Sequence, residues 1–332
     1  MKSNLIERTL KTIRNYDMIS PGDVVLTAVS GGPDSVFLLH LLTRLKSKLK
    51  LKKIIVANLD HGLRGIESRN DSLFVKKCSS GLGLRLISKR LNLKASKSGG
   101  LSPEELARSA RYKFFESAAR GSGANVIATG HTLDDQAETV LMRIIKGASL
   151  KGMAGIAPMR GWGSLKVVRP LIELEKSEII RYLDAAGIAY RIDRTNAEPI
   201  YFRNVVRKEV LPFLEKYNPR LKRALFNLAE HLREDFEFIS REKARIQKDI
   251  VRVCRNKVEI KLKDIIIQPG AIQKEILRDS LEKAGGEVKK LSFRHWKEAE
   301  SLIRRGRNGN SVDLPGSIRI SRSSTCLVFE RI

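Results

Sequence analysis

Cysteine is scarce in this chain, and its three copies lie far apart. Cys78, Cys254 and Cys326 form no Cys-x-x-Cys pair, which argues against a disulfide scaffold, a zinc ribbon and a cysteine-ligated cluster. No apolar run approaches the roughly 18 residues of a membrane-spanning helix. The first residues lack the apolar core of a signal peptide. We therefore expect free, buried thiols, no membrane association and a cytoplasmic location.

Acidic residues are also few. The 332 residues include 63 Lys and Arg but only 37 Asp and Glu, which gives a formal net charge of +26. Heat-adapted surfaces usually balance Lys with Glu, whereas so large an excess indicates a polyanionic partner, nucleic acid above all. With 42% hydrophobic residues the chain can still bury a core, and its length suggests roughly two domains.

A glycine-containing turn follows the first apolar stretch, at residues 24–29. It reads Ser30-Gly31-Gly32-Pro33-Asp34-Ser35. Two glycines permit positive φ and close approach of a ligand, and successive N–H groups at a helix start bind anions. Asp34 adds a carboxylate suited to Mg²⁺. The turn is not a Walker loop, since the chain has no Gly-Lys pair; an ordinary helix-capping turn is the plainer alternative.

Strands and helices alternate in the first part of the chain. The pattern predicts further strands at 53–59, 84–87, 125–129 and 165–168, and helices at 4–18, 36–42, 68–80, 102–120, 130–146 and 176–186. This alternation predicts an α/β fold with a Rossmann-like, doubly wound parallel sheet, whose ligand lies beyond the carboxyl ends of the strands.

The last third of the chain has a different character. It is basic and mainly helical, with predicted helices at 219–250, 272–284 and 292–303, a strand at 258–267, and a terminal hairpin around Pro315-Gly316. We therefore expect a catalytic domain over 1–215 and a basic, RNA-binding domain over 216–332.

Polar side chains directly follow several predicted strands. Asp134, Asp135 and Glu138 form a carboxylate cluster at a helix start. Such a cluster suits Mg²⁺ or an ammonium group, although one acid would suffice to cap the helix. Asp60 and His61 end the second strand, where they would border a nucleotide.

Arginines and one histidine add further candidates. Arg108 and Arg111 lie three apart on one predicted helix; they either neutralise phosphate charge or form a solvated face. His131 follows the fourth strand, where a ligand-binding and a structural role are equally consistent. The connection after residue 190 is rich in side chains that bind phosphates and bases, although it also fits a basic linker. Its candidate RNA contacts are Arg191, Arg194, Asn196, Arg203 and Arg207.

Together these motifs resemble the bacterial tRNA(Ile)-lysidine synthetase family, in its shorter form, of the PP-loop ATP pyrophosphatase superfamily. The resemblance covers about residues 30–215, with the motifs in a single order. They are Ser30 to Ser35, Asp60 to Arg64, Arg111-Tyr112, Gly130-His131 to Thr139, Lys146-Gly147 to Met153, Arg169-Pro170-Leu171, Asp193 to Asn196 and Arg203 to Arg207.

The resemblance implies a reaction in two steps. ATP adenylates the C2 oxygen of the wobble cytidine in the tRNA(Ile) with anticodon CAU, and pyrophosphate leaves. The ε-amine of L-lysine then attacks C2, and AMP leaves. Because that amine must be deprotonated, we expect a basic pH optimum. A homodimer is one candidate assembly, which the sequence does not decide.

The resemblance also implies roles for single residues. Ser30 to Ser35 would hold pyrophosphate, with Asp60, His61 and His131 beside the nucleotide. Asp34 and Asp134 would hold Mg²⁺, and Arg111 would stabilise the transferring phosphate. Asp135 and Glu138 would bind the ammonium groups of lysine, and one of them or Asp34 would accept the amine proton.

Three other functions are compatible with parts of the sequence. A PP-loop tRNA thiolase shares the loop and the basic surface but needs paired cysteines. An amide-forming synthetase of the same superfamily has no need of the +26 charge. A non-catalytic RNA-binding protein would not explain the intact loop and the carboxylate cluster.

Overall fold

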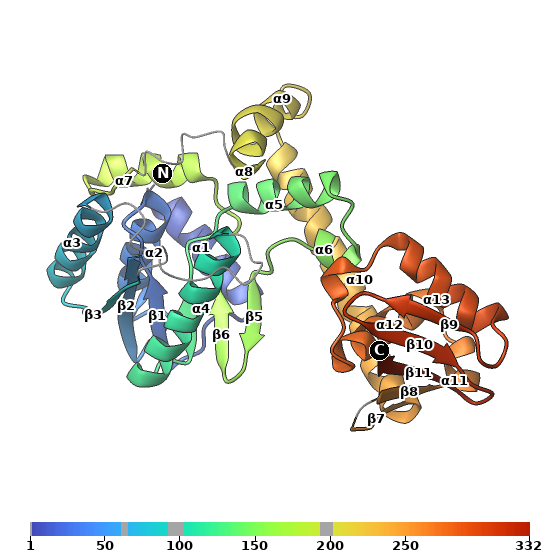
Figure 1. The fold of residues 1–332 in the computed structure, drawn as a ribbon. Coiled ribbons are helices and arrows are strands. Elements are labelled where there is room, and N and C mark those ends of the chain that lie inside the picture. Colours follow the sequence, from blue (N-terminus) through green and yellow to red (C-terminus); the bar gives the residue numbers. More distant parts are fainter. Residues whose placement is uncertain (1, 61–65, 92–102, 193–201, 256) are drawn as a thin grey trace. The chain divides into compact units, whose positions relative to one another are not determined.

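The computed structural model describes residues 2–60, 66–91, 103–192, 202–255 and 257–332 (Figure 1). Residue contacts divide the chain into two compact units, Met1–His231 and Leu232–Ile332. The division falls inside the helix α10 (Leu221–Ile250), whereas the sequence indicated a change of character before that helix, at residue 215.

The first unit contains a six-stranded sheet in the order β3-β2-β1-β4-β6-β5. Five strands run parallel, and β5 pairs with β6 in the antiparallel sense. The strands are β1 (Val24–Ala28), β2 (Lys53–Asp60), β3 (Arg85–Arg90), β4 (Val126–Ala128), β5 (Met159–Trp162) and β6 (Leu165–Val168). The predicted doubly wound sheet is confirmed, and β5 is an addition that the sequence did not reveal.

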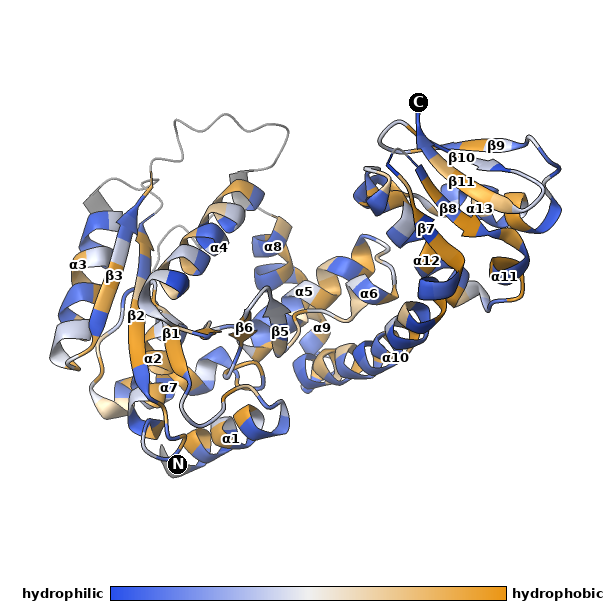
Figure 2. Cartoon of the chain, turned by 90° about the horizontal axis from the view of Figure 1, so that it is seen from below, coloured by the Kyte–Doolittle hydropathy of each residue, from blue (hydrophilic) through white to orange (hydrophobic). Residues whose placement is uncertain are grey.

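Helices cover both faces of this sheet because its central strands are apolar on both sides. In β2, Ile54 and Val56 pack into one buried cluster, and Ile55 and Ala57 into the other. Figure 2 shows β1 and β2 largely in the hydrophobic colour. The first cluster includes α1 (Lys2–Asn15), α2 (Pro33–Leu45), α3 (Ile66–Gly81) and α7 (Lys176–Ala186); the second includes α4 (Pro103–Ser122).

The strand order reverses direction between β1 and β4. From β1 the chain proceeds outward to β2 and β3, and then returns to place β4 on the other side of β1. Ligands of such sheets bind at this switch point, outside the carboxyl ends of the strands. The glycine turn after β1 and the segment 129–132 after β4 therefore meet there.

The carboxylate-bearing helix α5 (Leu133–Ile145) begins just after β4. Its apolar face packs against short helical segments and the start of α10, around the buried Val140, Val206 and Leu225. These segments are α8 (Phe202–Val205), a π-helix over Val206–Val210 and α9 (Leu211–Glu215). The short α6 (Leu150–Met153) follows α5 in the chain.

The second unit combines helices with a five-stranded antiparallel sheet in the order β7-β8-β11-β10-β9. The predicted terminal hairpin is present as part of this larger sheet. The strand predicted at 258–267 is wrong in its second half: β8 ends at Lys261, and α11 begins at Leu262, where Leu262 and Ile265 are buried at helical spacing. The strands are β7 (Val251–Val253), β8 (Lys257–Lys261), β9 (Ser311–Leu314), β10 (Ile318–Arg322) and β11 (Cys326–Arg331); the helices after α10 are α11 (Leu262–Ile266), α12 (Gly270–Lys283), a 3₁₀ turn (Val288–Lys290) and α13 (Phe293–Arg305).

The cysteines are free, as expected, but the prediction that they are buried is wrong. Cys254 is exposed, and Cys78 and Cys326 are partly exposed. None of the described helices is long and apolar enough to cross a membrane.

Candidate active site

The turn after β1 is closed by the hydroxyl group of Ser35. That hydroxyl donates to the carbonyl oxygen of Gly32 (2.9 Å) and accepts from the backbone N–H of Ser30 (3.2 Å). Gly31 has a φ of +94°, in the region that favours glycine. Pro33 is the first residue of α2. The turn therefore presents the N-terminus of a 13-residue helix, where backbone N–H groups bind anions.

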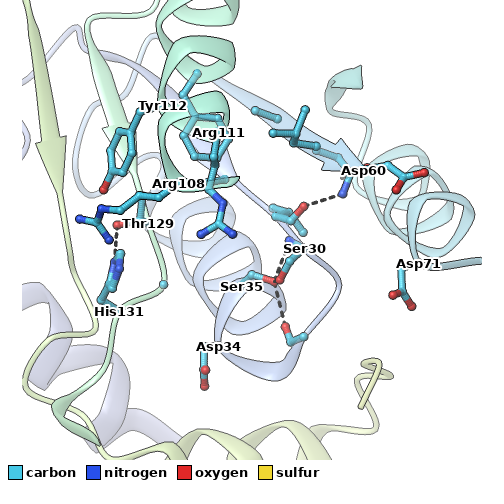
Figure 3. Close-up of a pocket in the computed structure, with 18 of the residues that line it drawn as sticks. Ser30, Asp34, Ser35, Asp60, Asp71, Arg108, Arg111, Tyr112, Thr129 and His131 are labelled. Carbon is cyan, nitrogen blue, oxygen red and sulfur yellow. Dashed lines mark hydrogen bonds between the residues drawn. The ribbon is translucent and has the colours of Figure 1, made fainter. Parts of the chain in front are cut away.

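A cavity of about 450 Å³ lies beside this turn (Figure 3). Its volume lies in the range of small-molecule and cofactor sites. In Figure 3, Arg108 and Arg111 extend from α4 toward the turn and His131. The cavity is lined by most of the residues that the sequence singled out, among them Ser30, Gly32, Asp34, Ser35, Asp60, Arg108, Arg111, His131, Asp135 and Arg203.

Some predicted residues do not line this cavity. Gly31 and Pro33 shape the turn without appearing in the cavity wall. The side chain of Arg191 binds Asp71, and its backbone N–H donates to the carbonyl of Gly31. The predicted contacts His61, Arg194 and Asn196 lie outside the described residues.

Asp34 is the least satisfied carboxylate of the site. Its Oδ1 is buried and has no hydrogen-bond partner among the described residues, and its Oδ2 lies 3.6 Å from Nζ of Lys176. Burial raises the pKa of Asp34 to about 6; Lys176 opposes this shift, and the charges of Asp135 and Asp134 add to it. A buried oxygen without a partner, close to two further carboxylates, suits a cation.

Asp134 is engaged on both oxygens. Oδ2 accepts from the backbone N–H of Lys176 (2.8 Å), and Oδ1 forms an ion pair with Lys222 (2.9 Å). The described part of the chain contains no group of three or more His, Cys, Asp or Glu side chains arranged to hold a metal ion. For Mg²⁺, therefore, Asp34 offers a suitable oxygen and Asp134 offers one only if a lysine moves; further ligands would have to be phosphate or water oxygens.

The other two carboxylates of the cluster bind arginines. Asp135 caps α5 through its Oδ2, which accepts from the backbone N–H and the hydroxyl of Thr132, and its Oδ1 binds Arg203 (2.8 Å). Glu138 is only 2% exposed and accepts from Arg203 (2.7 Å) and from Arg207. The predicted contacts of these two arginines with tRNA stay a prediction; in this structure their guanidinium groups bind carboxylates.

A second cavity, of about 280 Å³, adjoins the carboxylates. Asp34 and Asp135 line both cavities. The wall of the second one alternates in charge, with Asp134, Glu138 and Glu215 facing Lys176, Lys222 and Arg207. Such a wall suits a small ligand that carries both charges, as an amino acid does.

Four arginines act on His131, which lines the first cavity. Burial, followed by the charges of Arg169, Arg203, Arg108 and Arg111, holds the pKa of His131 well below its usual value, so its imidazole is neutral near pH 7. Its Nδ1 lies 2.9 Å from the hydroxyl of Thr129. A neutral histidine at this place can donate or accept a hydrogen bond without adding charge.

The sequence did not reveal the part that Lys176, Lys222 and the buried Arg169 play in this region. Lys176 begins α7, which follows the strand β6 after a short connection. Lys176 could have been singled out from the sequence, because it follows β6 as the other candidate residues follow β1, β2 and β4. Arg169 follows β6 directly; its guanidinium donates to the carbonyl of Ala157, and it hydrogen-bonds the side chain of Tyr112.

Gly130, in the segment after β4, lies directly against the turn after β1. A Cβ atom there would lie 3.1 Å from the backbone carbon and oxygen of Asp34 and 3.2 Å from the backbone nitrogen of Ser35. These distances are tighter than ordinary contacts, so a side chain here would require the turn to shift by a few tenths of an ångström.

Comparisons with known proteins agree with this picture. Residues 1–214 match the family model of the PP-loop domain. The chain is 35% identical over 328 residues to a tRNA(Ile)-lysidine synthase of Clostridioides difficile (strain 630), and the match covers 98% of this chain and 70% of that protein. For a tRNA(Ile)-lysidine synthase of Geobacter sulfurreducens, the identity is 35% over 332 residues with the same coverage.

Among solved structures, the U34-tRNA thiolase NcsA of Methanococcus maripaludis is similar with a TM-score of 0.59 and 21% identity. That match covers 70% of this chain and 80% of the thiolase chain. At this level of identity, the likeness shows a shared fold.

Proposed function

The chain belongs to the tRNA(Ile)-lysidine synthase family, whose members are ATP-dependent PP-loop enzymes that modify tRNA, and on that premise we propose that it ligates L-lysine to the wobble cytidine of tRNA(Ile). In the first step, the C2 oxygen of the cytidine attacks the α-phosphorus of ATP, and the bond to pyrophosphate breaks. In the second, the ε-amine of lysine attacks C2, the C2–O bond breaks, AMP leaves and the amine loses a proton.

One observation carries the proposal: Asp34, Arg111 and Asp135 line a single cavity together with the anion-binding turn. The turn would hold the pyrophosphate end of ATP, and Arg111 would stabilise charge on the transferring phosphate. His131, neutral near pH 7, would border the nucleotide. No covalent protein nucleophile is required, since the residues act by positioning and by stabilising charge.

Mg²⁺, when bound, would neutralise phosphate charge, and Asp34 is the residue that would hold it. Asp134 would contribute to the same site after exchanging one of its lysine partners.

For lysine, the contacts of the carboxylates favour a division of labour. Asp135 lines both cavities and has one oxygen bound to a single arginine, so it is placed to receive an ammonium group. Glu138 is buried between Arg203 and Arg207, so it would act mainly by positioning these arginines beside the substrate.

The decisive experiment measures incorporation of labelled lysine into a transcript of tRNA(Ile) with the anticodon CAU. The methionine tRNA with the same anticodon serves as the control. We expect ATP-dependent labelling of the isoleucine tRNA alone, with one AMP formed per lysine. Incorporation of sulfur, or AMP release without lysine transfer, would refute the proposal. A thiolase function has less support, because the three cysteines are free and widely spaced.

A further inference from the structure

Two arginines lie against one tyrosine at the edge of the first cavity. The guanidinium carbons of Arg108 and Arg160 lie 5.3 and 4.8 Å from the ring centre of Tyr112. Arg160 also lies 5.9 Å from the ring of Trp162, which meets Tyr112 edge-on at 5.2 Å. We call these four residues the arginine–aromatic platform. Cation–π contacts of this kind fix the plane of a guanidinium group and leave its N–H donors available.

The positive charge of the platform is not balanced by acid. Within the described part of the chain, neither Arg108 nor Arg160 forms an ion pair, and both are exposed. Arg120, on the same helix as Arg108, differs: it pairs with Glu116 at 2.7 Å. An unbalanced pair of guanidinium groups repels itself, and an anion between them would relieve that repulsion.

The positive charges of Arg108 and Arg160 also affect the pKa values of their neighbours Tyr112 and Arg169. Burial acts to raise the pKa of the Tyr112 hydroxyl, but Arg169, Arg108 and Arg160 outweigh burial and lower it. Burial lowers the pKa of Arg169, Tyr112 raises it, and Arg160 and Arg108 lower it further. The charges of Arg108, Arg160 and Arg169 thus act together around Tyr112.

The platform extends from the cavity outward. Arg108 and Tyr112 line the cavity, and Figure 3 shows both hanging from α4 above Thr129 and His131. Arg160 and Trp162 lie beyond the cavity wall on β5, which pairs only with β6 among the described strands and is the edge of the sheet. A linear polymer that places one of its residues in the cavity would therefore continue over the platform.

We propose that the arginine–aromatic platform binds the sugar–phosphate backbone of single-stranded RNA next to the nucleotide that enters the cavity. Arg108 and Arg160 clamp a phosphodiester through forked N–H groups, and the rings of Tyr112 and Trp162 keep those forks oriented. Arg160 and Trp162 lie outside the cavity whose wall contains the turn that would hold the triphosphate of ATP, so this part of the platform is separate from the proposed nucleotide site. The inference rests on the proposed function, since it requires that a tRNA nucleotide enters the cavity.

The test compares binding of an RNA stem-loop, with CAU in its loop, across a salt series by fluorescence anisotropy. For Arg160→Ala we expect about tenfold weaker binding and a log–log salt slope lower by about 0.7, the value for one lost contact to a single strand. Arg160→Lys keeps the charge but loses the fork, so its salt slope should stay near that of the wild type while its affinity falls. Arg120→Ala is the matched control and should bind like the wild type, because its charge is already paired.

Two further measurements separate this inference from its alternatives. A non-hydrolysable ATP analogue should bind equally to wild type and Arg160→Ala; parallel losses for analogue and RNA would overturn the inference in favour of a nucleotide site. Equal RNA affinity and slope for Arg160→Ala and Arg120→Ala would overturn it outright. Lysine incorporation by the wild type is scored separately, so failure of the proposed reaction and failure of the RNA clamp are distinguishable.

Discussion

Two aspartates, one in each compact unit, show opposite uses of a partly buried carboxylate. Asp279, in the second unit, accepts from Gln247 and pairs with Lys243 (3.3 Å) and Lys283 (2.9 Å). Burial acts to raise its pKa, but these partners lower it to about 2. Asp34 has one lysine at 3.6 Å and an unpartnered oxygen, and its pKa is raised to about 6.

The difference lies in how many partners the protein itself supplies to each carboxylate. Ionisation of Asp279 stabilises the fold, because its hydrogen-bond and ion-pair partners are already in place. Ionising Asp34 destabilises the fold, because the carboxylate is buried and its Oδ1 has no hydrogen-bond partner among the described residues. Perturbed carboxylates in cavities are candidates for function on these grounds, and the pair provides a controlled comparison within one molecule.

The largest effect should come from Asp34→Asn on catalysis. Removing the carboxylate that we propose holds Mg²⁺ should slow pyrophosphate release by about a hundredfold to a thousandfold. The measurement is release of pyrophosphate with saturating tRNA and varied Mg²⁺. Asp279→Asn is the control. A rate for Asp34→Asn within a factor of about two of that control would be incompatible with the assignment.

The same substitution should stabilise the fold at neutral pH. An aspartate whose pKa is about 6 when folded and near 3.8 when unfolded binds more protons in the folded state between these values. Its contribution to stability therefore falls as the pH rises from about 4 to 6 and stays low above 6. Asp34→Asn should raise the free energy of unfolding at pH 8 by up to about 3 kcal/mol. Denaturant unfolding at pH 8 and pH 4 measures this gain, which should shrink toward pH 4.

Asp135→Asn should separate the two chemical steps. A lost charged hydrogen bond to an ammonium group is worth about 1.5–3 kcal/mol, or roughly a tenfold to hundredfold loss in lysine use. Pyrophosphate release should be spared, because it precedes lysine attack. Both rates are measured on one tRNA preparation, and equal loss of both would contradict the assignment of Asp135 to lysine.

Asp279→Asn should have the opposite sign in stability. A pKa lowered to about 2 means that the stabilisation is present above about pH 4 and is lost as the pH falls from 4 to 2. Because solvent screens this partly exposed carboxylate, the substitution at pH 7 should cost about 1 kcal/mol of unfolding free energy. Urea titrations at pH 7 and pH 3 test this, and an undiminished cost at pH 3 would rule out the electrostatic explanation.

Lysine transfer should also depend on pH. Since only the neutral amine attacks, the transfer rate should rise between roughly pH 6 and 9. Single-turnover transfer from preformed adenylated tRNA isolates this step. A flat profile, with chemistry shown to be rate-limiting, would exclude deprotonation of lysine as the cause.

Much of the first unit could be predicted because its signals are local. β6 (Leu165–Val168) and α7 (Lys176–Ala186) have the predicted bounds. The sequence Met159-Arg160-Gly161-Trp162 gave no sign of a strand, since β5 is short, largely exposed and paired on one side only. In the second unit, the apolar residues after Lys261 fit a strand or a helix equally well over so short a run.

The site was predictable in its location and only partly in its contacts. Parallel strands bring their carboxyl ends to one edge, so the turn after β1 and the start of α5 had to meet. The binding of Arg203 and Arg207 to Glu138 depends on residues 65 and 69 positions away in the chain. No local pattern encodes such a pair. A basic segment in an enzyme that modifies RNA instead suggests contacts with phosphate groups.

The narrow space at Gly130 makes the site behave as a single mechanical part. A methyl group there would act as a wedge between the nucleotide-gripping turn and the helix that carries Asp135. Because the two segments lie this close, a shift of the turn would press on the backbone of the segment after β4. If ATP and lysine bind as we propose, occupation of the nucleotide site would therefore affect the position of the helix that carries Asp135.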